Sequence, residues 1–460
     1  MSYGIGADSE IGCLRTALMH RPGRELRRIT PRTKSLLGLD GLPWVAKAQQ
    51  EHDVLADALT RMGTEVIYFA GLLQDVLEYT DARDEAIASV LANSELGAEL
   101  APAVSKHLEA LPPEDLASVL IAGLTTTELR AGHGLVFDLL EAHDFVIDPL
   151  PNLVFSRDSS AWVGDQVVVG ALPGPRRRET DLLAIIYRRH PRFIGVRPPY
   201  QESGIRLDCG DLLLLGPGVV AVGVGPASAP ASAELLARYL LEAGIASSVL
   251  GVPMTRCGTA PHLYSSHLDT SRLDTICTVL DHGVVLMAPA LAFTMTALTI
   301  TMRNGELRVS SPQPFLEAAG RALDVDRVTV IETGIDSAST WSGQWDDGGN
   351  ALVVGNRTII CDERNAETNT RLTAAGFEVV TVPYGELGRV RGGPRAMCVP
   401  MARDQVVVGG RRPVDMEQTR PACGRPPAQR TRSADSAVPI SRAGVAPEQP
   451  VRRDELAPLR

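Results

Sequence analysis

Two polar segments of this 460-residue chain carry side chains that could perform chemistry. The first, Leu150–Asp158, contains a Pro-Asn turn, an aromatic residue and an Arg-Asp pair, and by itself it fits a capping or ion-pair turn. The second, Gly388–Asp404, is rich in glycine and arginine and includes Cys398, whose thiol is a potential nucleophile. The seven cysteines are scattered, without a CxxC pair or zinc-type spacing, so the sequence predicts neither disulfides nor a metal site.

Both segments resemble signatures of one enzyme family. Gly388–Asp404 resembles the nucleophile loop of arginine deiminases, which reads roughly GRGRGG-x-x-C-M-S/T-x-P-x-x-R-D/E, and Leu150–Asp158 resembles the family's P-N-x-x-F-S/T-R-D signature. Further matches follow in the family's order, from Ser9–Arg15 to Arg364–Asn369. The chain is therefore identified as a member of the arginine deiminase family, within the guanidino-group-modifying superfamily.

The resemblance implies a reaction and a ligand. The family hydrolyses the guanidinium of L-arginine to citrulline and ammonia without a metal, and no other cofactor is expected. A cysteine attacks the guanidinium carbon, a histidine handles protons, and carboxylates hold the cationic head. Because a guanidinium is planar, cationic and resonance-stabilised, it needs a strong nucleophile and bidentate acidic partners. The expected partner is a small guanidino molecule.

Several family positions are retained. Asp158 and Asp274 match guanidinium-binding carboxylates of the family and are expected catalytic residues. The expected substrate-binding residues are those that match the family's pocket: Asn152, Phe155, Arg176, Asp208, Asp211 and Arg391. Arg391 matches the arginine that binds the substrate carboxylate, and Arg176 is a weaker match to a second one. Without the family context, each arginine would fit a surface ion pair.

Four other positions depart from the family. Ala396 stands where the nucleophilic cysteine belongs, and Arg272 stands where the catalytic histidine belongs. Asp208 shortens a family glutamate, and Ala227 replaces another carboxylate-binding arginine. Arginine stays charged near neutral pH, so it cannot shuttle protons. Together these changes predict a remodelled pocket with altered activity.

Near neighbours offer a rescue. On an extended segment Cys398 would point to the same side as Ala396, and His267 lies in a second His-Leu-Asp-Thr sequence. Three hypotheses follow. In the first, the chain is a C–N hydrolase that acts on a guanidino substrate with Cys398 and His267, or by a chemistry that needs no cysteine nucleophile. In the second, it is a pseudoenzyme that binds a small cationic ligand or a partner. In the third, Arg272 recruits an anionic group. Alternatively, Cys398 is a packed small residue and His267 a surface residue.

The elements that must position these residues divide the chain into zones. The family implies an α/β fold, a fivefold propeller of ββαβ modules with an all-helical insertion. We expect the first part of the propeller at 1–71, the insertion at 72–147, the remainder at 148–410 and a disordered basic tail rich in Pro and Arg at 411–460.

Local patterns place individual elements within these zones. Apolar periodicity predicts strands and helices, and helix starts are expected at Pro112–Asp115 and Thr125–Glu128. The predicted strands are Leu14–Met19, Thr64–Phe69, Gln166–Gly170, Val219–Val224, Gly283–Met287, Ala351–Ile360 and Glu378–Val382, and the predicted helices include Trp44–Met62, Ser232–Ala243 and Glu367–Ala375.

Composition limits the partners. The net charge of −10 argues against nucleic acid or an anionic membrane surface. No apolar run is long enough for a membrane span, and no secretory signal is evident, which predicts a cytoplasmic protein. The sequence is compatible with a homo-oligomer.

Overall fold

The computed structural model describes residues 4–29, 42–130, 132–201, 204–254, 272–334, 349–390 and 392–406. The chain divides into two compact units, residues 1–425 and 426–460, and all described residues belong to the first. The predicted tail at 411–460 and the candidates His267 and Arg391 lie outside the described residues.

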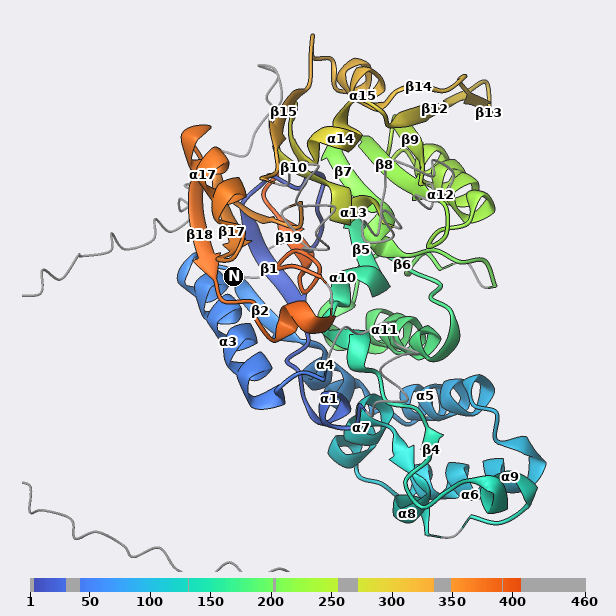
Figure 1. The fold of residues 1–460 in the computed structure, drawn as a ribbon. Coiled ribbons are helices and arrows are strands. Elements are labelled where there is room, and N and C mark those ends of the chain that lie inside the picture. The colour runs from blue at the N-terminus through green and yellow to red at the C-terminus, as the bar shows by residue number, and fades with distance from the viewer. Residues whose placement is uncertain are drawn as a thin grey trace, which may run out of the picture. The chain divides into compact units, whose positions relative to one another are not determined.

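Five modules with one strand pattern make up the α/β fold (Figure 1). In each module two strands pair antiparallel, and a third strand or bridge lies parallel to the second. Four modules have three strands each: β19 (Val399–Arg403), β1 (Leu14–Met19) and β2 (Glu65–Tyr68); β7 (Leu212–Gly216), β8 (Val219–Val224) and β9 (Ser248–Pro253); β10 (Cys277–Asp281), β11 (Val284–Met287) and β15 (Thr329–Glu332); β16 (Leu352–Gly355), β17 (Thr358–Asp362) and β18 (Glu378–Val382).

The fifth module is shorter. It pairs β5 (Ser160–Val163) with β6 (Gln166–Val169), and a single parallel bridge joins Val168 to Tyr200. One sheet is extended beyond its module, because β12 (Thr296–Arg303) adds antiparallel to β9. Two further strands then pair with β12, namely β13 (Glu306–Val309) and β14 (Gln313–Pro314).

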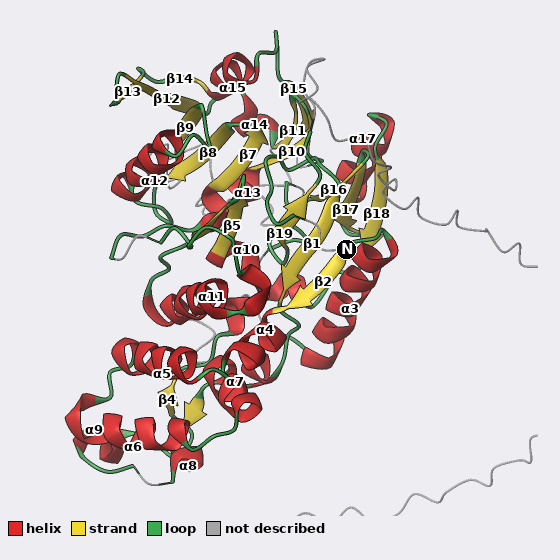
Figure 2. Ribbon diagram, turned by 180° about the vertical axis from the view of Figure 1, so that it is seen from behind, coloured by secondary structure: helices red, strands yellow, loops and turns green. Residues whose placement is uncertain are grey.

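One helix precedes the parallel strand or bridge of each module, and Figure 2 shows these five helices at the periphery of the strands. They are α3 (Val45–Arg61), α11 (Arg177–Arg189), α12 (Pro230–Glu242), α15 (Phe315–Leu323) and α17 (Ala366–Ala374). Strands such as β7 and β8 are almost continuously apolar because they are covered on both faces. The expected ββαβ module is therefore confirmed.

Short helices fill the connections between these elements. They are α1 (Arg24–Arg27), η1 (Pro151–Val154), α10 (Ser156–Ser159), η2 (Gly174–Arg176), η3 (Pro191–Phe193), η4 (Cys209–Asp211), α13 (Leu273–Ile276), α14 (Pro289–Ala292) and η5 (Leu387–Val390).

The segment between β2 and β5 is largely helical and lies at the lower end of both views (Figures 1 and 2). Its helices are α4 (Phe69–Val76), α5 (Thr80–Asn93), α6 (Gly97–Glu109), α7 (Pro113–Ala122), α8 (Thr126–Leu129) and α9 (Leu135–Leu139). The expected helix starts are confirmed, since α7 begins at Pro113 and a capping box of Thr125 and Glu128 opens α8.

The structure adds a two-stranded ribbon to this helical segment. Strand β3 (Leu124–Thr125) pairs antiparallel with β4 (Phe145–Ile147). Gly123 makes the turn possible, because its φ of 76° is open to glycine and a side chain there would overlap the carbonyl of Ile147. The segment is therefore helical with one short ribbon.

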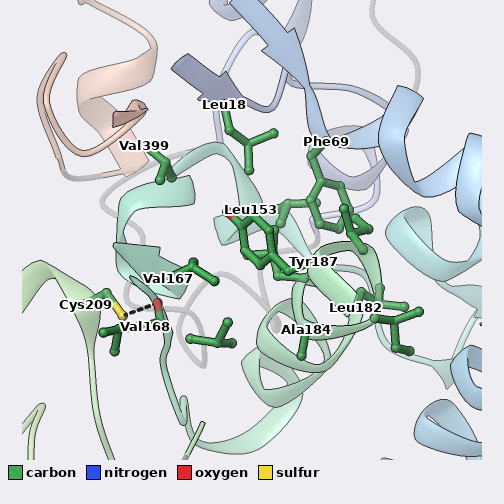
Figure 3. Close-up of a cluster of buried hydrophobic side chains, with 14 of the residues drawn as sticks. Leu18, Phe69, Leu153, Val167, Val168, Leu182, Ala184, Tyr187, Cys209 and Val399 are labelled. Carbon is green, nitrogen blue, oxygen red and sulfur yellow. Dashed lines mark hydrogen bonds between the residues drawn. The ribbon is translucent and has the colours of Figure 1, made fainter. Parts of the chain in front are cut away.

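A single apolar cluster joins this segment to the sheets (Figure 3). Phe69 on α4 and Leu18 on β1 belong to the same cluster as Val167 on β6 and Leu182 on α11. Tyr187 adds a polar tie, since its hydroxyl lies 3.0 Å from Oγ of Ser160. Among the described residues, no helix is both long and apolar enough to cross a membrane.

Candidate active site

The candidate aspartates lie on turns that precede the first strand of a module. Helix α10 carries Asp158 before β5, η4 carries Asp211 before β7, and α13 carries Asp274 before β10. Asn350 precedes β16, and Ala396 precedes β19. Because η4 contacts both α10 and α13, the repeated architecture brings acidic turns from separate modules together.

Backbone contacts fix these carboxylates in place. Oδ1 of Asp208 accepts a hydrogen bond from N of Gly210 at 2.8 Å, and Oδ1 of Asp211 accepts one from N of Leu273 at 2.9 Å. A Cβ on Gly210 would lie 3.1 Å from both Oδ1 of Asp208 and Oδ2 of Asp274. Gly210 thus separates two carboxylates that lie close together.

Ser228 makes a contact with Asp208 that the sequence did not predict. Its Oγ accepts a hydrogen bond from N of Asp208 at 3.1 Å. It belongs to the Gly-Pro-Ala-Ser segment in which Ala227 replaces an expected arginine. The segment therefore still supports the site, through a hydroxyl group.

Two guanidinium groups lie against these carboxylates. Nη1 of Arg272 is 2.6 Å from Oδ1 of Asp158, and its Nε is 3.4 Å from Oδ1 of Asp274. Nη2 of Arg176 is 3.0 Å from Oδ2 of Asp158 and 3.1 Å from Oε2 of Glu179. Acidic and basic groups therefore alternate from Glu179 to Asp274, and Arg176 is engaged within the protein.

The protonation of the cluster follows from burial and charge. Burial, with the charge of Asp158, raises the pKa of Asp208 well above its usual value. Burial also raises the pKa of Asp274, and it raises that of Asp211 to about 6. Although burial lowers the pKa of Arg272, Asp158 and the other aspartates hold it well above the usual value. Arg272 is thus a permanent cation near Asp208, Asp211 and Asp274, whose carboxyl groups resist ionisation.

Ala396 is held by its backbone. Oδ1 of Asn350 accepts hydrogen bonds from N of Arg395 at 3.1 Å and N of Ala396 at 3.2 Å. The carbonyl of Ala396 accepts one from N of Arg157 at 3.1 Å. Ala396 is fully buried. Asp158 directly follows Arg157 in α10. Position 396 is therefore fixed beside the carboxylate turn, with only a methyl group.

A buried charge cluster that the sequence did not reveal supports this loop. Oε1 of Glu10 lies 2.5 Å from Nη2 of Arg157 and 3.3 Å from Nη2 of Arg395. Although burial raises the pKa of Glu10, Arg157, Arg395 and Arg403 hold it at about 2. One carboxylate thereby ties α10 to the loop that contains Ala396. The only sequence signal was the family match at 9–15.

The structure places Cys398 in an apolar cluster with residues such as Met19 and Leu352. The side chain is fully buried, and burial raises the pKa of its thiol to about 12. Residues 394–397 form a turn, with N of Cys398 bonded to the carbonyl of Arg395 at 3.2 Å. The extended segment on which the argument for Cys398 depended is absent at 394–397, so strand alternation says nothing about where Cys398 points.

Two further candidates lie near the loop. Asn152 is half-buried in η1, and its carbonyl accepts a hydrogen bond from N of Phe155 at 2.9 Å. Phe155 is buried, and its ring packs against Gly392, where a side chain would overlap it. In the part of the chain that the structure describes, no group of three or more His, Cys, Asp or Glu side chains is placed to hold a metal ion.

Comparison with known proteins gives consistent sequence matches. The family model described as arginine deiminase matches residues 35–403. The arginine deiminase of Rhodococcus jostii strain RHA1 is 44% identical over 408 residues, which is 88% of this chain and 98% of that protein. The arginine deiminase of Mycobacterium bovis strain BCG is 44% identical over 410 residues, covering 88% of this chain and all of that protein.

Solved structures give more distant matches. A mutant dimethylarginine dimethylaminohydrolase from Pseudomonas aeruginosa, in complex with citrulline, covers 84% of this chain and 99% of its own, with 13% identity and a TM-score of 0.47. The N-terminal domain of ArgZ, an arginine dihydrolase from cyanobacteria, covers 84% of this chain and 97% of its own, also with 13% identity and a TM-score of 0.47.

Proposed function

This chain belongs to the arginine deiminase family, and from that membership we propose that it is a catalytically inactive member that does not hydrolyse L-arginine. The proposal rests on one observation above the others. Ala396, at the position of the family's nucleophile, is a buried methyl group on a loop held by Asn350 and Arg157. A methyl group cannot attack a guanidinium carbon. Loss of a nucleophile costs on the order of 10⁴-fold in rate or more.

The charge at position 272 supports the proposal independently. The family's histidine must both accept and release a proton. Asp158 and Asp274 hold the pKa of Arg272 well above its usual value despite burial. A permanently charged group cannot act as a general base.

The rescued hydrolase, with Cys398 as nucleophile and His267 as its partner, is disfavoured by the environment of the thiol. A thiol reacts as its thiolate. With a pKa of about 12, only about 1 thiol in 10⁵ is ionised at pH 7. Cys398 also packs among apolar side chains, with no described carboxylate or histidine bonded to it. The role that remains for such a protein is binding, of a ligand or of a partner.

Product release tests the proposal. Purified protein is incubated with L-arginine, and citrulline and ammonia are measured for the wild type, Cys398→Ala and Cys361→Ala. Cys361 is the matched control, because burial raises the pKa of its thiol to about 12 as well. We expect no product above the protein-free blank in any sample. Citrulline from the wild type contradicts the proposal, and its loss in Cys398→Ala alone would identify the rescued hydrolase.

A further inference from the structure

Among the ion pairs described for the carboxylate cluster, the shortest joins Arg272 to Asp158. The guanidinium of Arg272 contacts Asp158 through Nη1 and Asp274 through Nε. The side chain of Arg272 is 14% exposed, and those of the two aspartates are 1% and 0% exposed. Arg272 thus presents two edges of one planar cation to two buried carboxylates from different modules.

The carboxylates depend on this cation. Neither oxygen of Asp274 accepts a hydrogen bond from the described residues, and Oδ1 of Asp158 has only the close ion pair with Arg272. Arg176 occupies only the other oxygen of Asp158. A buried carboxylate without a partner is strongly unfavourable. Without Arg272, the two aspartates would therefore form an unsatisfied site for a planar cation.

The backbone directs Arg272 to this place. The residue precedes α13 in an extended conformation, and its side chain makes no capping hydrogen bond to that helix. Its carbonyl accepts a hydrogen bond from Oγ1 of Thr275 at 2.7 Å. Asp211 fixes the next residue, Leu273, through the hydrogen bond described above. The start of α13 is thereby anchored, and the side chain of Arg272 is free to reach Asp158.

We propose that Arg272 is a built-in ligand, which fills a guanidinium-binding site formed by Asp158 and Asp274 and excludes free guanidino molecules. This inference rests on the proposed function, because a protein that turned over arginine would have to empty the site in every cycle. It also goes further, since it states that the binding site persists and that one side chain closes it.

Removal of the side chain tests the proposal. Arg272→Ala deletes the atoms of an N-ethylguanidinium ion, so that ion is the matched probe. We expect a saturable rise in Tm with millimolar N-ethylguanidinium for Arg272→Ala, and none for the wild type. Arg308→Ala is the control, since Arg308 is 64% exposed and pairs only with the exposed Glu306 among the described residues. Tetramethylammonium, a cation without a planar donor fork, should have no effect on any variant.

Each result has a defined meaning. The proposal is overturned if N-ethylguanidinium raises the Tm of Arg272→Ala no more than that of the wild type. It is also overturned if tetramethylammonium raises the Tm of Arg272→Ala as much as N-ethylguanidinium does. If Arg272→Ala does not fold alone, the circular dichroism of protein refolded with and without the probe becomes the measurement. Recovery of folded protein by N-ethylguanidinium supports the proposal, and no recovery overturns it. Because these readouts measure binding, they separate this inference from the citrulline assay.

Discussion

Replacement of Glu10 by glutamine should remove a large fraction of the stability of this protein. The side chain is 5% exposed, and three arginines hold the pKa of its carboxyl at about 2 although burial raises it. The ordinary value is 4.5, so the folded protein favours the charged form by about 3 kcal/mol. Glutamine keeps the shape and removes the charge. Loss of one partner of a buried ion pair costs about 3–5 kcal/mol in general, which agrees with this value.

Urea unfolding at pH 7, followed by circular dichroism, measures the loss. We expect Glu10→Gln to lower the free energy of unfolding by about 3 kcal/mol, from the shift above. The control is Glu306→Gln at an exposed pair with Arg308, which should change it by less than about 1 kcal/mol. Because the folded pKa of Glu10 is depressed, its contribution is present above pH 4.5 and is lost as the pH falls towards 2. A Glu10→Gln variant as stable as the wild type at pH 7 would refute the assignment of this carboxylate as the tie between α10 and the loop.

Two other perturbations test buried groups. Burial, with the nearby His20, lowers the pKa of His52 from 6.5 to about 4, so stability should fall by up to about 3 kcal/mol as the pH drops from 6.5 to 4. Urea titrations across that range should show the slope in the wild type, and its persistence in His52→Gln would contradict this origin. Gly223→Ala should lower Tm by several degrees, because its Cβ would overlap Oδ1 of Asp211, whereas Gly251→Ala, with its nearest atom 3.7 Å away, serves as the control in differential scanning calorimetry. Equal Tm values for the two glycine variants would show that Asp211 yields without cost.

Local patterns in the sequence predicted much of the fold. The apolar runs Leu14–Met19 and Val219–Val224 coincide with β1 and β8. The predicted helix at Ser232–Ala243 overlaps α12 at Pro230–Glu242. These elements could be predicted because alternation, apolar runs and helical spacing are local properties of the chain.

The contacts of the site were harder to predict from the sequence. The pairing of Arg272 with Asp158 joins turns of two modules, and Glu10 contacts Arg395 across almost the whole described chain. No local spacing reports such a contact. Family matches identified Asp158 and Asp274 as candidates, yet they could not reveal that a side chain of the same protein lies between them. The turn at 394–397 also shows that the direction of the Cys398 side chain depends on a local backbone conformation that the sequence did not settle.

The pairing of β1 with β19 has a consequence for biosynthesis. Of the described strands, β1 leaves the ribosome first, and its antiparallel partner follows after nearly all of the described residues. At a synthesis rate of about 5–20 residues per second, the edge of β1 that pairs with β19 stays unpaired for roughly 20–80 s. An unpaired strand edge is a site of aggregation. The nascent chain therefore has to protect Leu14–Met19 until Val399–Arg403 is synthesised, and among the five described modules the one that carries Ala396 is completed last.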